Sequence, residues 1–369
     1  MHHDELLAEG LYDPTVDDPS RLPLLQRCLD IGLTVDEIRE AGDDLIDLAV
    51  QRLLAGGEES FTIAEVADRA GVPLLRAEQI ARASGIDRPG LAERYYSERD
   101  VGLISTVGLA FDVLGEEATL QLIRVGAAAV ARLGDAAMST FLTSVGARAS
   151  RDDSGLELID ANQATIEMLP RFGDVLIQML THYLRQAYRP RSEVSVNSVL
   201  GQGVDTRELA MGFADLVGSA TVTDRKSLAD LNIALDIFER TATDIITAGG
   251  GRVVKFIGDE VMFRADSADI ACAVAVDLVE FVRTDRALPP LRAGLALGEV
   301  LSREGDFYGP VVNLASRITK FAPLHGVVAT ADMTDALAAP SDFTIHRLGA
   351  IEMRGISEPV ELATLSRPE

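Results

Sequence analysis

Apolar positions in the first half of the chain recur every three to four residues, which is the period of an α-helix. Two segments, Thr34–Glu37 and Thr62–Glu65, have the Ser/Thr-x-x-Glu pattern that caps the first backbone N–H groups of a helix. Residues 101–148 are rich in Ala, Leu and Val and predict two or three mostly buried helices. A longer helix is expected over about 157–189, with Pro170 and Gly173 as candidate kinks.

After residue 205 the pattern changes to short apolar runs that alternate with helical segments. The predicted strands are Glu208–Leu216, Arg252–Ile257, Val261–Ala265, Arg292–Leu301, Val327–Thr330 and a closing pair within 343–365. The predicted helices cover residues 226–247, 268–284, 310–321 and 332–339. Strands and helices interleaved in this way favour an α/β or an α+β sandwich.

The change of pattern also predicts the domain organisation. A length of 369 residues suits two domains. We expect a helical regulatory domain over residues 1–189, a linker rich in turn-forming residues over 190–204, and a second domain over 205–369.

Composition narrows the function classes. The formal net charge of -24 argues against nucleic acid, because binding to phosphates rests on basic surface. No run of 18 apolar residues and no basic start followed by an apolar core are present, so we expect no transmembrane segment and no signal peptide. The two cysteines, Cys28 and Cys272, lie far apart and fit a reducing, cytoplasmic location.

Candidate chemistry gathers in the second half. Asn313 and Arg317 are four residues apart in a predicted helix, so they share one face and can reach one polyanionic target together. Asp215 and Asp259 each stand where a predicted strand ends. Carboxylates for Mg²⁺ or Mn²⁺ and an arginine for a phosphoryl group are what phosphoryl chemistry requires. Spacing alone makes Lys255 a solvated strand lysine and Asp306 a turn aspartate.

Three motifs occur in order: Phe213–Gly218, Lys255–Asp259 and Asp306–Arg317. Together they resemble the catalytic domain of class III nucleotidyl cyclases over roughly residues 205–367. A helical N-terminal domain joined to one such domain is similar to the soluble, two-domain mycobacterial adenylyl cyclases of the pH-sensing type. The motifs depart from many members at Ser219-Ala220, near the metal loop.

The resemblance implies a βαβ sandwich with a ferredoxin-like core and a phosphorus–oxygen lyase that converts ATP to 3′,5′-cyclic AMP and pyrophosphate in signal transduction. It also implies a role for each motif residue: Asp215 and Asp259 hold two Mg²⁺ or Mn²⁺ ions, Lys255 and Asp306 read adenine, Asn313 orients the ribose, Arg317 stabilises the transition state, and Arg354 binds phosphate.

The resemblance further implies a homodimer. In the family one chain supplies the two metal aspartates, and its partner supplies the other five residues. A chain that carries all seven therefore predicts two equivalent sites related by two-fold symmetry. Acid pH acting through His182, just before the linker, is a further hypothesis for regulation.

Three alternatives remain open at this stage. A catalytically silent, nucleotide-binding sensor would share the fold. Thr62–Ile86 has the helix–turn–helix spacing of a DNA-binding regulator, although the acidic charge favours a simple packing unit. The apolar helices within 101–148 raise the hypothesis of an enclosed lipid-like ligand, which core packing would equally explain.

Overall fold

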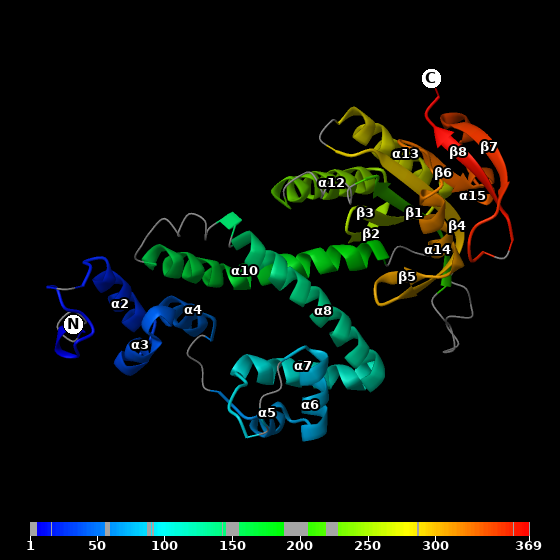
Figure 1. Cartoon of the computed structure of the whole chain (residues 1–369). Helices are drawn as coiled ribbons and strands as arrows, with labels where there is room; N and C mark the ends of the chain where they lie inside the picture. Colours follow the sequence, from blue (N-terminus) through cyan, green and yellow to red (C-terminus); the bar gives the residue numbers. More distant parts are fainter. Residues whose placement is uncertain are drawn as a thin grey trace. The chain divides into compact units, whose positions relative to one another are not determined.

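The computed structural model of the chain divides into two compact units, Met1–Arg191 and Ser192–Glu369 (Figure 1). It describes residues 6–15, 17–55, 60–86, 90, 92–141, 143–144, 155–187, 206–218, 228–285, 288–356 and 358–368. The predicted linker 190–204 and Ser219-Ala220 lie outside the described residues.

The first unit is helical, as predicted. Its described elements are α2 (Arg21–Asp30), α3 (Val35–Ala41), a 3₁₀ turn η1 (Gly42–Asp44), α4 (Leu45–Ala55), α5 (Ile63–Ala70), α6 (Leu74–Ala83), α7 (Glu98–Leu114), α8 (Glu116–Phe141) and α10 (Leu156–Ala187). None of the helices in the described ranges is long and apolar enough to cross a membrane.

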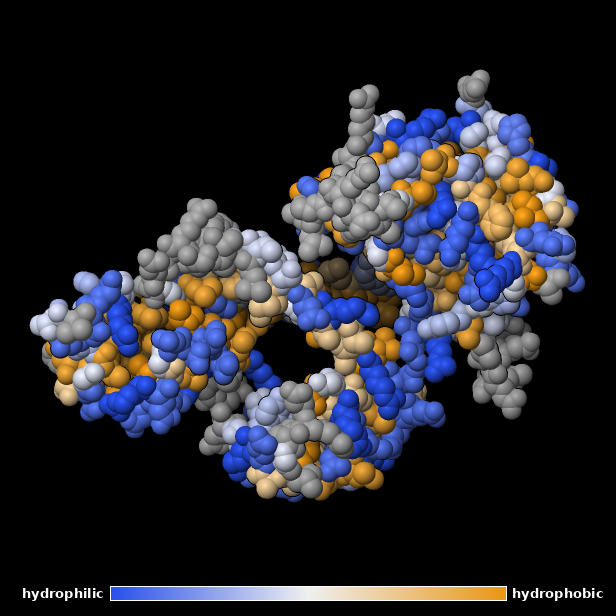
Figure 2. Space-filling model, viewed as in Figure 1, coloured by the Kyte–Doolittle hydropathy of each residue, from blue (hydrophilic) through white to orange (hydrophobic). Residues whose placement is uncertain are grey.

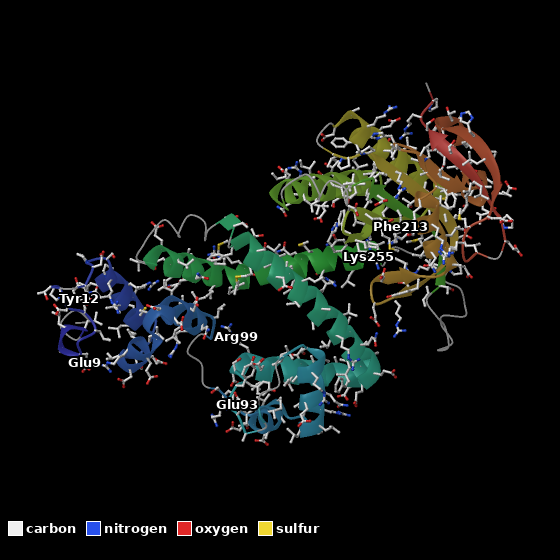
Figure 3. All side chains as sticks on the ribbon, in the orientation of Figure 1. Glu9, Tyr12, Glu93, Arg99, Phe213 and Lys255 are labelled. Atoms are coloured by element: carbon white, nitrogen blue, oxygen red, sulfur yellow. The ribbon has the colours of Figure 1, made fainter. Side chains whose placement is uncertain are left out.

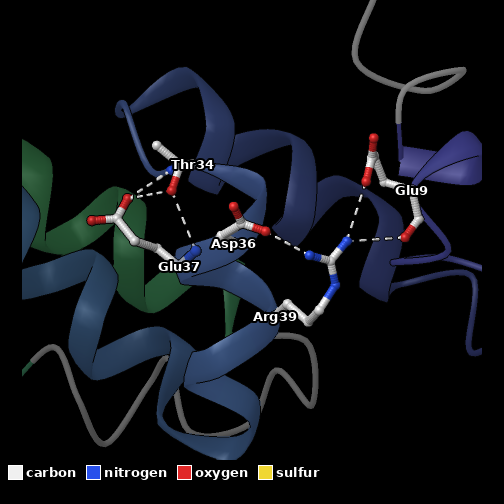
Figure 4. A network of polar contacts seen from close by, with 5 residues as sticks. All are labelled: Glu9, Thr34, Asp36, Glu37 and Arg39. Carbon is white, nitrogen blue, oxygen red and sulfur yellow. Dashed lines mark hydrogen bonds and ion pairs between the residues drawn. The ribbon is translucent and has the colours of Figure 1, made fainter.

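Local capping fixes where α3 begins (Figure 4). The Thr34 hydroxyl accepts a hydrogen bond from the Glu37 backbone N–H at 3.3 Å, and the Thr34 N–H donates to the Glu37 carboxylate at 2.8 Å. Arg39 then joins Asp36 and Glu9 through ion pairs of 2.6 and 3.2 Å. The predicted capping box is confirmed, and a cap of this kind contributes about 1 kcal/mol to helix stability.

Two separate cores stabilise this unit. One packs α2, α3 and α4 against the beginning of α10, where Ile159 is fully buried. The other packs α5, α6, α7 and the start of α8. The predicted capping box at Thr62 is present, and Gly71 ends α5 in the left-handed conformation (φ 69°) that a glycine adopts without strain.

The segment with helix–turn–helix spacing is a packing unit within the second core. The two arginines of α6 face acidic partners, since Arg76 lies 3.7 Å from Glu116 and Arg82 lies 3.9 Å from Glu78. The Arg76 guanidinium also stacks over the Phe111 ring. Each of these partly exposed cations therefore has an acidic neighbour within the same unit, and the absence of a nucleic-acid partner stays a prediction.

The prediction that residues 101–148 form mostly buried helices is wrong for α8. Only Thr119 and Leu120 of that helix are buried among its described residues. Its small apolar side chains suit a helix without specifying a partner, and the helix continues past the α5–α7 core. The lipid-like ligand is not supported either, because the hollow that the described residues form at the start of α8 is lined by Glu116, Glu117, Gln121 and Arg124 beside Leu120.

The second unit is α+β. Its strands are β1 (Thr206–Leu216), β2 (Arg252–Ile257), β3 (Glu260–Ala265), β4 (Leu291–Arg303), β5 (Asp306–Tyr308), β6 (Val327–Thr330), β7 (Thr344–Ile351) and β8 (Val360–Ser366). Its helices are α12 (Leu228–Ala248), α13 (Ala268–Thr284), α14 (Pro310–Thr319) and α15 (Ala331–Asp335), with a 3₁₀ turn η4 (Pro340–Asp342). The last predicted helix, 332–339, is shorter than expected.

The sheet runs in the order β2-β3-β1-β4-β6-β8-β7, with β5 on β4. Strand β1 pairs antiparallel with both β3 and β4, and β2 pairs antiparallel with β3. The chain order β1-α12-β2-β3-α13-β4 with this strand order is the split βαβ topology of a ferredoxin-like core. The predicted fold class is confirmed.

Apolar cores cover both faces of the sheet. Helices α12 and α13 pack on one face and α14 packs on the other. Two glycines permit close approach: a Cβ on Gly212 would lie 2.2 Å from the Phe263 ring, and one on Gly294 would lie 2.3 Å from the Thr319 nitrogen. Helix α14 is thereby held directly against β4, which fixes the side chains that it presents.

Candidate active site

The two predicted metal aspartates lie at the same end of the sheet. Asp215, near the end of β1, stands opposite Glu260 at the start of β3. The Leu216 N–H donates to the Asp259 carbonyl oxygen at 3.2 Å, which joins the end of β1 to the β2–β3 turn. Gly258 makes that turn with a φ of 64°. Two carboxylates from positions far apart in the sequence are thus brought together.

Arg292 is a site residue that the sequence analysis missed. It begins the apolar run of β4 opposite Asp215, and its Nε and Nη2 donate to Asp215 Oδ2 at 3.1 and 2.6 Å. Both side chains are about three-quarters buried or more. A charged residue at the start of a central apolar strand was the signal that could have found it. Its guanidinium holds the Asp215 carboxylate in one orientation.

Glu260 adds a third acidic group at this place. Burial, together with the negative charges of Asp215 and Asp259, raises the pKa of the Glu260 carboxyl to about 7, against the opposing effect of Lys320 and Arg292. The negatively charged carboxylates therefore repel one another when no cation is bound between them. That is the electrostatic environment a divalent cation would relieve.

The donor set fits such a cation. Mg²⁺ and Mn²⁺ prefer carboxylate oxygens, and Mg²⁺ keeps several waters and substrate phosphates as ligands. The part of the chain that the structure describes contains no cluster of three or more ligand side chains that could hold a metal ion by itself. Two aspartates supply only part of the coordination sphere of a metal ion, so they suit a metal that also binds a phosphate of the substrate.

Lys255 and Asp306 form an ion pair between β2 and β5, across 51 residues of sequence (Figure 3 labels Lys255). The second Asp306 oxygen accepts the Phe307 N–H at 2.9 Å. The interpretation of Asp306 as a turn aspartate is wrong, because Asp306 begins β5 and pairs with Arg303 of β4. A donor and an acceptor stand side by side here, from separate elements.

Helix α14 presents the remaining pair. Pro310 occupies its first position, where the missing N–H costs nothing. Asn313 and Arg317 follow one turn apart on one face, as predicted. The Arg317 Nη1 donates to the Arg354 carbonyl oxygen at 2.8 Å, and Gly355 lies against the same guanidinium. The backbone of the β7–β8 connection thus aims Arg317, while the Arg354 side chain is exposed.

The structure therefore groups the predicted residues into three sets. Asp215 and Asp259 gather with Arg292 and Glu260, Lys255 meets Asp306, and Arg317 meets the backbone at Arg354. Each set comes from elements that only the fold brings together.

Both halves of this chain are similar in sequence to other proteins. Residues 2–188 match the family described as the adenylate cyclase regulatory domain. An adenylate cyclase of Streptomyces coelicolor is 32% identical over 82% of this chain and 78% of that protein. A pH-sensitive adenylate cyclase of Mycobacterium tuberculosis is 28% identical over 94% of this chain and 88% of that protein.

Among solved structures, the catalytic core of a rhodopsin-guanylyl cyclase with converted specificity, in complex with ATPalphaS, has a TM-score of 0.41 and 21% identity, over 45% of this chain and 99% of that one. The Streptomyces coelicolor and Mycobacterium tuberculosis cyclases, by contrast, span most of the chain. The chain is an enzyme of the adenylate cyclase class. It belongs to the adenylate cyclase family, and its N-terminal half is that family's regulatory domain.

Proposed function

We propose that the second unit converts ATP to 3′,5′-cyclic AMP and pyrophosphate at a site shared by two catalytic domains of a head-to-tail homodimer. The 3′-hydroxyl attacks the α-phosphorus in line, the new P–O bond closes the ring, and pyrophosphate leaves. The observation that carries the proposal is the Lys255–Asp306 pair, because the fold joins a donor and an acceptor that the sequence separates by 51 residues.

The pair suits adenine. The Lys255 ammonium donates to the acceptor nitrogen N1 of the ring, and the Asp306 carboxylate accepts from the 6-amino group. Guanine offers the opposite polarity at these atoms. Because Lys255 and Asp306 already contact each other, the base meets two groups held in position before it binds.

The chain's other residues act on the sugar and the phosphates. Asn313 orients the ribose. Arg317, which donates a hydrogen bond to the Arg354 carbonyl, stabilises the negative charge that develops at the α-phosphate. The Arg354 side chain, which is exposed, is assigned to phosphate binding. Two Mg²⁺ or Mn²⁺ ions per site, bound by Asp215 and Asp259, would lower the pKa of the 3′-hydroxyl and offset the triphosphate charge.

Geometry supports the homodimer. Lys255 and Asp259 are four residues apart on the β2–β3 hairpin, yet the proposed roles place them at opposite ends of one nucleotide. A partner chain resolves this conflict, because one chain supplies the aspartates and the other supplies the base-reading pair and α14. Two-fold symmetry then makes two equal sites.

Removing the donor tests the base reader. Lys255→Met is expected to lower kcat/KM for ATP by about 10²-fold, because the base loses its hydrogen bond and Asp306 is left without its cation. Arg252→Met, on the same strand, is the matched control and should change the rate little. The measurement is cyclic AMP formed from ATP beside cyclic GMP formed from GTP. Equal losses in both variants would contradict the assigned role.

Regulation through pH is part of the proposal. His182 is an exposed residue of α10, shortly before the catalytic unit, and histidine changes its charge near neutral pH. The rate at pH 5.5 relative to pH 8 is expected to be higher for the full chain than for residues 205–369, which contain their own buried cores. His182→Gln should reduce that ratio in the full chain. Equal ratios in all three proteins would refute acid stimulation through the helical unit.

A further inference from the structure

Helix α10 has two unlike halves. Near its beginning, Ile159 is fully buried, and this part packs against α2 and α4. The exposed large apolar side chains of the helix all lie beyond Glu167. They are Met168, Leu169, Phe172, Val175, Ile177, Met179, Leu180, Tyr183 and Leu184, each 44–64% exposed. Figure 2 shows apolar surface over the helical unit.

The polar residues of this half, apart from Thr181 and Gln186, follow one narrow stripe. They are Glu167, Arg171, Asp174, Gln178, His182 and Arg185, spaced three or four residues apart. The apolar residues fill the remaining circumference. Within them, Leu169, Phe172, Leu176, Met179 and Tyr183 alternate spacings of three and four. That is the 3.5-residue repeat of a helix that packs along another helix.

The exposed apolar side chains in the second half of α10 favour burial against another surface. Contiguous exposed apolar patches of this extent mark interaction sites. Nine large side chains, each about half exposed, offer roughly the 800 Å² that one partner contributes to an ordinary stable interface. The polar stripe carries both signs, with Glu167 and Asp174 beside Arg171 and Arg185. An anionic membrane surface would favour a basic stripe instead, so the charges favour a protein partner.

We propose that α10 pairs in parallel with α10 of a second copy of this chain, through the apolar face centred on Phe172, Leu176 and Met179. This inference rests in part on the proposed catalytic homodimer, which already requires two copies. Only residues 188–205 separate the end of α10 from β1. Each helix is followed in the sequence by one catalytic domain, so a pair of helices brings two catalytic domains into one dimer.

A parallel pair places each residue of the repeat beside the same residue of the second copy. A cysteine introduced at such a position can therefore form a disulfide between the two chains. The two native cysteines, Cys28 and Cys272, are buried. In the full chain, Met179→Cys is expected to form a disulfide-linked dimer at least tenfold faster than Gln178→Cys, the neighbouring position on the polar stripe. Equal rates, or no dimer from Met179→Cys, would overturn the parallel pairing.

A charge at the same two positions provides the second test. Met179→Glu is expected to raise the dimer dissociation constant at least tenfold by sedimentation equilibrium, and Gln178→Glu should leave it unchanged. Both positions are exposed in one chain, so neither change should alter the circular dichroism. An unchanged dissociation constant for Met179→Glu would refute the α10 interface.

The two proposals fail separately. If an Asp259→Ala chain mixed with an Arg317→Ala chain regains activity but Met179→Cys forms no dimer, the α10 pairing is wrong and the catalytic homodimer stands. If Met179→Cys forms the dimer but the mixed variants stay inactive, the α10 pairing stands and the shared catalytic site is wrong.

Discussion

Replacing Arg317 by alanine is expected to lower kcat by on the order of 10²–10³, with a much smaller change in KM for ATP. The guanidinium stabilises negative charge that develops only as the 3′-oxygen attacks and pyrophosphate leaves. Its loss therefore raises the free energy of the transition state more than that of the bound substrate. One of its five N–H donors is engaged by the Arg354 carbonyl, which aims the rest. Initial rates of cyclic AMP formation over a range of ATP concentrations provide the measurement.

The matched control is Arg283→Ala. Arg283 is an exposed arginine in the last turn of α13, and its removal should leave kcat within a factor of two or so, since surface changes of this kind are nearly neutral. Arg317→Lys should recover little, because an ammonium lacks the planar fork of the guanidinium. A loss confined to KM would show that Arg317 binds ATP uniformly and does not act in the transition state.

Replacing Asp259 by alanine is expected to abolish measurable cyclic AMP formation, a loss on the order of 10³ or more. Asp215 alone cannot hold two divalent ions, and Arg292 already takes part of its charge. The Asp259 backbone carbonyl accepts the Leu216 N–H, and the variant keeps that hydrogen bond, so folding should be preserved. Cyclic AMP is measured with Mg²⁺ and with Mn²⁺, and thermal melting checks the fold.

Mixing the two inactive variants extends this experiment to the dimer. An Asp259→Ala chain paired with an Arg317→Ala chain forms one site with both groups intact and one site with neither. Half of the dimers in an equal mixture are mixed, so about a quarter of the wild-type activity should return. A mixture as inactive as its components would contradict the shared site, and activity in either variant alone would contradict the assigned roles.

Arg292 and α8 illustrate where sequence reasoning reached its limit. Arg292 stood in a correctly predicted strand, but its contact with Asp215 spans 77 residues and depends on β1 lying beside β4. The composition of α8 predicted burial. Composition, however, reports only how favourable the transfer of a side chain out of water would be, and not whether another element covers it. Whether a neighbouring helix reaches it depends on where the α5–α7 core ends.

The sequence by itself determined the local features: the capping boxes at Thr34 and Thr62, and the shared helix face of Asn313 and Arg317. These depend on hydrogen bonds and spacings within one or two helical turns, which neighbouring residues set. Only the tertiary structure decided that Lys255 meets Asp306 and that the Arg354 carbonyl holds Arg317. Contacts across 51 and 37 residues need a specific sheet order and a helix packed on it, and no short stretch of sequence carries that information.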